Sequence, residues 1–163
     1  MLPQTIDLSS VQLEEISETL KELRWESEAH CVLLADITGQ LIEAQGILND
    51  MNTAVLSALA AGQLAATKEM ARLVGEPARF KLMLHEGEKQ TVYVSDVVGE
   101  LILVLVLDTR IPIGMVRLST QMAVEHLSHI IEDLSYVGAP VENEDWGDFD
   151  QLLSNELDFS TER

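Results

Sequence analysis

The chain has 163 residues, of which 47% are hydrophobic and only 4% are aromatic, so it can form one domain with an aliphatic core and falls outside the disordered class. Its 28 acidic residues outnumber 10 basic ones and give a formal charge of −18. Because binding to phosphate backbones and anionic lipids requires clustered lysine and arginine, this charge argues against nucleic-acid and membrane partners.

The single cysteine and the N-terminal stretch indicate the cellular setting. Cys31 is the only cysteine, which excludes an intramolecular disulfide and a cysteine-based zinc cluster, and its apolar surroundings indicate a buried structural thiol. The stretch MLPQTIDLSS lacks the basic and apolar regions of a signal peptide. The longest apolar run, 101–107, is far shorter than the ~20 residues that cross a bilayer. We therefore expect a cytoplasmic protein with no membrane insertion.

The first third of the chain predicts a helix followed by a β-hairpin. Ser9 and Gln12 match a capping box, and apolar residues at helical spacing follow them. The apolar run 31–35 is typical of a strand, and a turn around Gly39 leads to a second short strand over 41–45.

The middle of the chain predicts a second helix and two half-buried strands. The helix runs over 53–74, and Gly75 is a natural C-cap. Apolar and polar residues alternate over 79–85 and again over 90–95, which is the pattern of strands with one face in the core.

The segment LILVLVL, residues 101–107, is apolar at every position. A strand without alternation must be covered on both faces, so we place it in the middle of the sheet. A third helix begins near Pro112, which suits a first-turn position. The predicted order is α-β-β-α-β-β-β-α. Short turns join most of the strands, so the sheet is expected to be mostly antiparallel.

The composition changes after Tyr136. Residues 141–163 carry eight acids and one base, which is the composition of a disordered acidic tail. Four apolar residues nevertheless keep a helical spacing, which equally fits a short amphipathic segment that docks on this protein or on a partner: Trp146, Phe149, Leu153 and Leu157. We therefore divide the chain into a domain over 1–136 and an acidic tail over 137–163.

The second helix is unusually rich in alanine. On a helical wheel, the arc that we expect to face the sheet contains Val55, Leu59, Ala66, Met70 and Leu73. A separate stripe of small residues contains Ala54, Ala58, Ala61 and Ala65, with Gly62 between the two arcs and Leu64 expected to point away from the sheet.

Small side chains let two helices approach to or below the usual separation of about 8–10 Å. The stripe therefore predicts a second helix packed on it, most simply from a second copy of the chain related by a two-fold axis. An edge strand over 79–85 could pair with its own copy in the same event. The alternative is that alanine was selected for helix propensity and that this side of the helix lies in water.

Three segments and the apolar helix that follows them carry a resemblance to a known family: CVLLADITGQLIEAQG, LAAGQLAATKEMARLVGE and HEGEKQTVYVSDVVGELILVLVLDTRIPIGMVRL. Over about residues 8–135 the chain resembles the Roadblock family of dynein light chains, and within it the bacterial MglB type. The resemblance implies a profilin-like three-layer α/β sandwich with a five-stranded antiparallel sheet in the order 2-1-5-4-3. Helices one and three would cover one face and helix two the other.

The resemblance also implies a homodimer in which third strands pair with each other and second helices pack together. The residues of this chain that it places in the interface are Ala54, Ala58, Ala61, Gly62, Ala65, Arg79, Phe80, Lys81, Leu82 and Met83.

The usual partner of the family is a small Ras-like GTPase. Some MglB-type members accelerate its hydrolysis of GTP, and other members are scaffolds or motor light chains. The basic spot formed by Lys68 and Arg72 would complement an acidic switch region. We take as candidates for GTPase binding Gln63, Leu64, Thr67, Lys68, Ala71 and Arg72.

No residue pattern points to chemistry within the chain. There is no phosphate-binding G-x-x-x-x-G-K-[ST] motif, so the chain is not itself the GTPase. His126 and His129 could touch one metal from a helix, but no third ligand can be assigned. Internal arginines could in principle act on a phosphate, although the resemblance implies that MglB-type proteins work without one: Arg24, Arg72, Arg79, Arg110 and Arg117.

We therefore expect no catalytic residue, no metal and no cofactor, and a protein that is not an enzyme. Three hypotheses remain open: a regulator that binds a GTPase and stimulates hydrolysis, a scaffold of the same fold, and a ligand-sensing module with a pocket between helix and sheet. The absence of converging polar residues disfavours the third.

Overall fold

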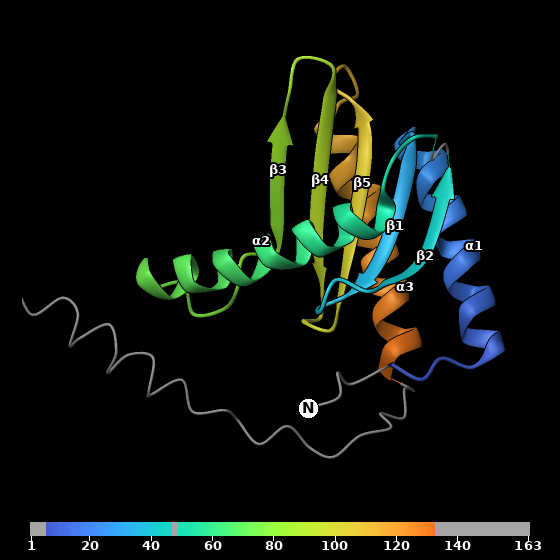
Figure 1. Ribbon diagram of the computed structural model, residues 1–163, viewed down its shortest axis with the longest axis horizontal. Helices are drawn as coiled ribbons and strands as arrows, with labels where there is room; N and C mark the ends of the chain where they lie inside the picture. Colours follow the sequence, from blue (N-terminus) through green and yellow to red (C-terminus); the bar gives the residue numbers. More distant parts are fainter. Residues whose placement is uncertain (1–5, 47–48, 133–163) are drawn as a thin grey trace, which may run out of the picture.

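An antiparallel sheet of five strands lies between two helical layers in the computed structural model, which describes residues 6–46 and 49–132 (Figure 1). The elements in chain order are α1 (Ser10–Ser27), β1 (Cys31–Asp36), β2 (Leu41–Gly46), α2 (Thr53–Leu73), β3 (Leu82–Glu86), β4 (Gln90–Val97), β5 (Leu101–Asp108) and α3 (Ile113–Glu132). The order of the elements is the predicted one. The predicted tail over 137–163 lies outside the described residues.

The sheet has the strand order β2-β1-β5-β4-β3, and every neighbouring pair is antiparallel. The central position of β5 confirms the interpretation of its unbroken apolar run, because all of Leu101–Leu107 is buried. The β3 strand is shorter than predicted: it begins at Leu82, and Arg79, Phe80 and Lys81 form the loop that leads into it.

The layer formed by α1 and α3 covers one face of the sheet with large side chains. The predicted capping box is present at the start of α1, where the backbone N–H of Gln12 donates to Ser9 Oγ at 3.3 Å and the backbone N–H of Ser9 donates to Gln12 Oε1 at 3.0 Å. Ile16 and Leu20 of α1 and Leu127 of α3 are fully buried in this core. Each such side chain contributes about 1.5–3 kcal/mol of transfer free energy.

The opposite face of the sheet is covered by α2 alone (Figure 1). Asn52 caps this helix, since its Oδ1 accepts a hydrogen bond from the backbone N–H of Val55 at 3.1 Å. In Figure 1, α2 crosses the strands and its C-terminal half projects beyond the edge strand β3. The buried side chains of α2 are few and mostly small: Ser57, Ala60, Ala61, Leu64 and Ala71.

The predicted rotation of α2 about its axis is wrong. Leu64, expected to point away from the sheet, is only 9% exposed and packs on it. The side chains expected to face the sheet are exposed instead: Val55, Leu59, Ala66, Met70 and Leu73.

The close packing under α2 accounts for this difference. The sheet presents Leu33, Ile102 and Val104 to α2, so only small side chains fit where the helix lies closest to the strands. The β1–β2 turn also contacts the helix: a Cβ on Gly39 would lie 2.7 Å from the Cα of Ala58. Gly39 has a φ of +91°, as the predicted tight turn requires.

Candidate interaction surface

The solvent side of α2 forms an apolar surface that we call the α2 outer face. It is defined by Val55, Leu59, Gly62, Ala66, Met70 and Leu73, which recur at spacings of three and four and therefore lie on one side of the helix. Leu59 is 66% exposed and Leu73 is 76% exposed. Exposed aliphatic side chains in a continuous row are typical of a surface that another protein covers.

This face continues toward an unpaired strand edge. β3 is the last strand of the sheet, and within the described residues nothing pairs with its outer edge. The helix passes over this edge (Figure 1), whereas the exposed Leu84 of β3 lies on the side of the sheet away from α2, since its neighbour Met83 faces the helix. A free edge is a template for pairing with another chain, so the helix face and the strand edge together offer an apolar and a hydrogen-bonding contact.

The residues predicted for a dimer interface fall into two groups. Ala54, Ala58, Gly62 and Ala65 are exposed on α2, beside or on its outer face. Ala61, at 7% exposure, lies against the sheet and cannot contribute to that face.

The five interface residues predicted near β3 lie partly in the strand and partly in the loop before it. Leu82 and Met83 lie in the edge strand, with Met83 buried beneath α2. Of the three residues in the preceding loop, Arg79 forms an ion pair with the buried carboxylate of Asp96, where Arg79 Nε lies 2.7 Å from Asp96 Oδ2. This pair fixes the loop to the end of β4.

The residues predicted to bind a GTPase do not share one surface. Lys68 and Arg72 are exposed in the last turns of α2, and Arg72 Nε lies 3.0 Å from Glu69 Oε2. Leu64 and Ala71 are buried and present nothing to a partner, which corrects their assignment to this surface. The remaining two are partly buried: Thr67 donates its hydroxyl hydrogen to the carbonyl of Leu64, and Gln63 bonds the ring of His85.

The sequence profile of the Roadblock/LC7 domain matches residues 15–107, which is more than half of the chain. The chain belongs to the Roadblock/LC7 domain family. Helices α1 and α2 and all five strands fall within, or largely within, the matched region.

Among solved structures, this Roadblock domain is similar to MglB proteins. Myxococcus xanthus MglB is 35% identical with a TM-score of 0.70, and the match covers 72% of this chain and 95% of that one. The gliding protein MglB from Thermus thermophilus is 33% identical with a TM-score of 0.75, covering 81% and 99%. A structure described as MglB with a tetrameric arrangement is 32% identical with a TM-score of 0.75, covering 81% and 98%.

A more distant solved structure shares the fold and supports no statement about function. A Roadblock/LC7 domain from Streptomyces avermitilis shares 13% identity with a TM-score of 0.65, and the match covers 71% of this chain and 97% of that one. Among curated proteins no match was found.

Several polar groups that the sequence offered as functional candidates have partners within this Roadblock domain. Arg110 forms an ion pair with Asp108, and Arg24 donates from Nε to the carbonyl of His30 at 3.3 Å. Burial raises the pKa of the Cys31 thiol, which lowers its thiolate fraction and fits the predicted structural role.

His126 and His129, the pair considered as metal ligands, both contact other side chains of the domain. His126 bonds Thr19 of α1, and His129 Nδ1 lies 3.6 Å from Glu132 Oε2. Within residues 6–46 and 49–132, no three histidine, cysteine or carboxylate side chains gather as a metal site. In the same part of the chain, no helix is both long and apolar enough to cross a bilayer.

Proposed function

We propose that this Roadblock domain is a homodimeric regulator of a small Ras-like GTPase and that it stimulates hydrolysis of the bound GTP. The observation that carries the proposal is its similarity to MglB structures over at least 95% of their length at 32–35% identity. In the family, the usual role is to bind such a GTPase. A cytoplasmic location in a bacterial cell, where GTP is available, belongs to the same proposal.

The α2 outer face supports self-association in this proposal. Two such faces related by a two-fold axis would cover each other's Leu59 and Met70, and each buried apolar Å² contributes about 25 cal/mol. Gly62 lies at the centre of the face, and a Cβ built on it meets nothing within 4 Å in the single chain. A glycine there allows the two helices to approach closely.

The surface offered to the GTPase would be formed by both copies. Lys68 and Arg72 are exposed in the last turns of α2, but Lys68 lies four residues after the buried Leu64 and therefore on the side turned away from the outer face, so each copy of the dimer would present its own basic groups beside the paired helices. We propose that the chain acts through binding and has no active site of its own. Arg24, Arg79 and Arg110 have partners within the domain, which favours realignment of the GTPase's own groups over an arginine supplied in trans.

The experiment is a phosphate-release assay with the small Ras-like GTPases of the same organism, each loaded with GTP. Stimulation by a trans arginine reaches roughly 10³–10⁵-fold, so we expect a smaller rise here, on the order of 10–100-fold. Leu59→Asp on the α2 outer face should abolish the rise, whereas Leu118→Asp, at an equally exposed leucine of α3, should preserve it.

Co-elution of the chain with a GTPase at an unchanged hydrolysis rate would support the scaffold alternative instead. Failure of every such GTPase to bind would overturn the proposed function.

A further inference from the structure

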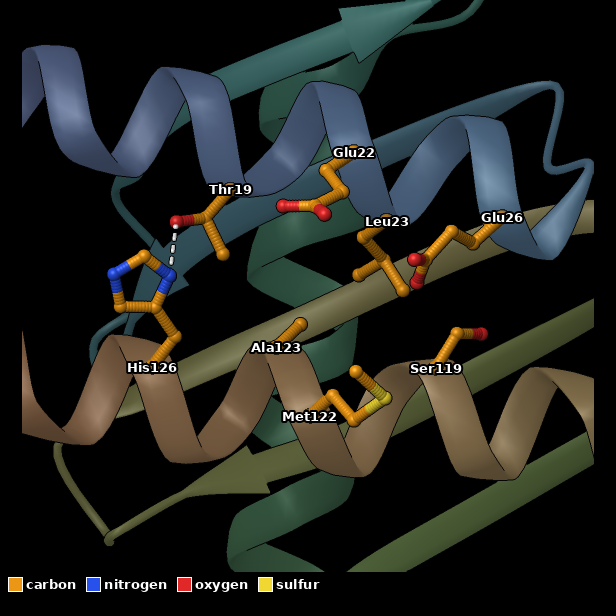
Figure 2. A pocket seen from close by; sticks show the side chains of 8 residues that line it. All are labelled: Thr19, Glu22, Leu23, Glu26, Ser119, Met122, Ala123 and His126. Carbon is orange, nitrogen blue, oxygen red and sulfur yellow. Dashed lines mark hydrogen bonds between the residues drawn. The ribbon is translucent and has the colours of Figure 1, made fainter.

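A groove separates α1 from α3 on the face of the domain opposite to α2. It encloses a hollow of about 130 Å³, into which Glu22 and Glu26 extend from α1 and Met122 from α3 (Figure 2). Thr19 and His126 close one end: the Thr19 hydroxyl donates to the carbonyl of Glu15 at 2.8 Å and lies 3.1 Å from His126 Nδ1. Beyond His126 a second, shallower hollow continues along α1.

One wall of the groove is acidic. The shallower hollow is lined by Glu14, Glu15 and Glu18, so five glutamates of α1 follow the groove from end to end. Of these, Glu18 is paired with Lys21 at 2.7 Å. Within the described residues no lysine or arginine forms an ion pair with Glu22 or Glu26.

The other wall comes from α3, where Met122 and Ala123 lie beside Ser119 and His126. Met122 is 58% exposed, and Met115 and Leu118, which lie outside the hollow seven and four residues before it, are exposed as well and continue an apolar row along α3. Methionine side chains are flexible and polarizable, so they adjust to partners of different shape. Trp25 of α1 lines neither hollow but is 84% exposed, next in sequence to Glu26.

We propose that this groove binds a basic amphipathic helix of a partner protein. The lysine or arginine side chains of that helix pair with Glu22 and Glu26, and its apolar side packs on Met122 and Leu118. A helix fits because the two hollows follow α1 from Val11 to Glu26, a length of about 22 Å at 1.5 Å per residue.

Charge decides among the possible occupants. A second copy of the chain in the same groove would place glutamates against glutamates, and an anionic membrane surface would be repelled by the same wall. Residues 141–163 carry eight acids and one base, so that segment is repelled as well. A cationic partner complements the wall and relieves part of the −18 charge.

The groove is independent of the proposed GTPase regulation. The sheet separates it from the α2 outer face (Figure 1), so both surfaces can be occupied at the same time. Loss of one activity therefore does not imply loss of the other, and the two proposals fail separately.

The probe is a fluorescent 18-residue peptide with lysines along one side of a helix and leucines along the other. Its binding to the full chain is followed by fluorescence anisotropy at about 150 mM salt, where the Debye length is about 8 Å. We expect saturable binding at one site per chain. A peptide with the same composition in scrambled order should bind at least about tenfold more weakly, because it presents no apolar side.

Matched variants separate the groove from general attraction to an acidic protein. Glu22→Lys combined with Glu26→Lys should weaken binding about tenfold or more. The control combines Glu76→Lys with Glu88→Lys, two exposed sites outside the groove with the same change in charge, and should alter the affinity less than about threefold. Leu118→Ala combined with Met122→Ala should weaken binding of the amphipathic peptide several-fold and leave binding of the scrambled peptide unchanged.

Equal loss in the two lysine pairs would overturn the proposal, since it would mean that net charge alone attracts the peptide. A photoreactive group on the peptide supplies the second measurement: cross-links to α1 and α3 support the groove, and cross-links confined to α2 refute it. An affinity that falls as the protein concentration rises would assign the groove to a second copy and would also overturn the proposal.

Discussion

The two helical layers of this Roadblock domain are built in opposite ways. In the α1 and α3 layer the large side chains face inward, as Leu20 and Leu127 do, and glutamates line the outside. In α2 the small side chains face the sheet, and the large ones, such as Leu59 and Leu73, face outward. The first layer encloses a core of large side chains and leaves a few apolar residues such as Leu118 exposed beside its glutamates, whereas the second exposes most of its large side chains in one continuous row.

The largest effect is expected from a charge introduced on the α2 outer face. Leu59→Asp should convert the proposed dimer into single chains, because a buried carboxylate without a partner costs several kcal/mol. Sedimentation equilibrium at micromolar concentration measures the result. Leu118→Asp is the matched control, since Leu118 is 62% exposed on the other layer and should leave the dimer intact. A Leu59→Asp protein that remains dimeric would show that the face is not the interface.

A second test concerns the sheet-facing side of α2. Ala60→Leu forces a larger side chain between the helix and the strands, and we expect a loss of about 1–3 kcal/mol in the free energy of unfolding. Urea denaturation checks this value. Ala54→Leu, at an exposed site in the first turn of the same helix, should change it by less than about 0.5 kcal/mol. Equal losses at the two sites would contradict the observed rotation of α2.

The smallest effect is expected at the centre of the outer face. Gly62→Ala adds a methyl group with open space around it in the single chain and should favour the helix by about 0.5–1 kcal/mol. In the proposed dimer the same methyl group meets the other helix, so association should weaken several-fold in sedimentation.

Gly114→Ala supplies the comparison, because Gly114 also has nothing within 4 Å of a built Cβ and lies in α3. It should gain helix stability without any change in association. If both alanine variants associate equally well, the helices do not meet at Gly62.

Most of the fold could be predicted because each element carries its own local signal. The unbroken apolar run of β5 can be satisfied only in the middle of a sheet covered on both sides. The capping box at Ser9 and the turn at Gly39 mark boundaries through backbone chemistry that does not depend on the rest of the chain.

The rotation of α2 could not be predicted, because both sides of this helix are apolar and a helical wheel does not show which one is buried. The choice depends on the surface beneath it, where Leu33 and Ile102 leave room mainly for small residues such as Ala60, with Leu64 packed beside them. The assumption that the larger residues face the core therefore failed, and with it the assignments of Ala61, Leu64 and Ala71 to exposed surfaces.

The groove between α1 and α3 depends on tertiary packing as well. Glu22 and Glu26 are four residues apart, which indicates a shared side of α1. Nothing in the sequence places Met122 beside them, since that contact follows from how α3 lies against α1. The exposed methionines of α3 were the one available signal, and they have the same spacing as core residues.

Because α2 projects beyond β3, the stability of the chain should depend on its concentration. The last turns of α2 lie past the sheet (Figure 1), and apart from the buried Ala71 their side chains are exposed, so in a solitary chain they would open more readily than the turns over the strands and exchange their amide hydrogens earlier. When a second copy supplies the missing support, the melting temperature depends on concentration by mass action. Below the concentration at which copies pair, the chain would have both a frayed helix and an uncovered apolar surface, which are the features that proteases and chaperones recognise.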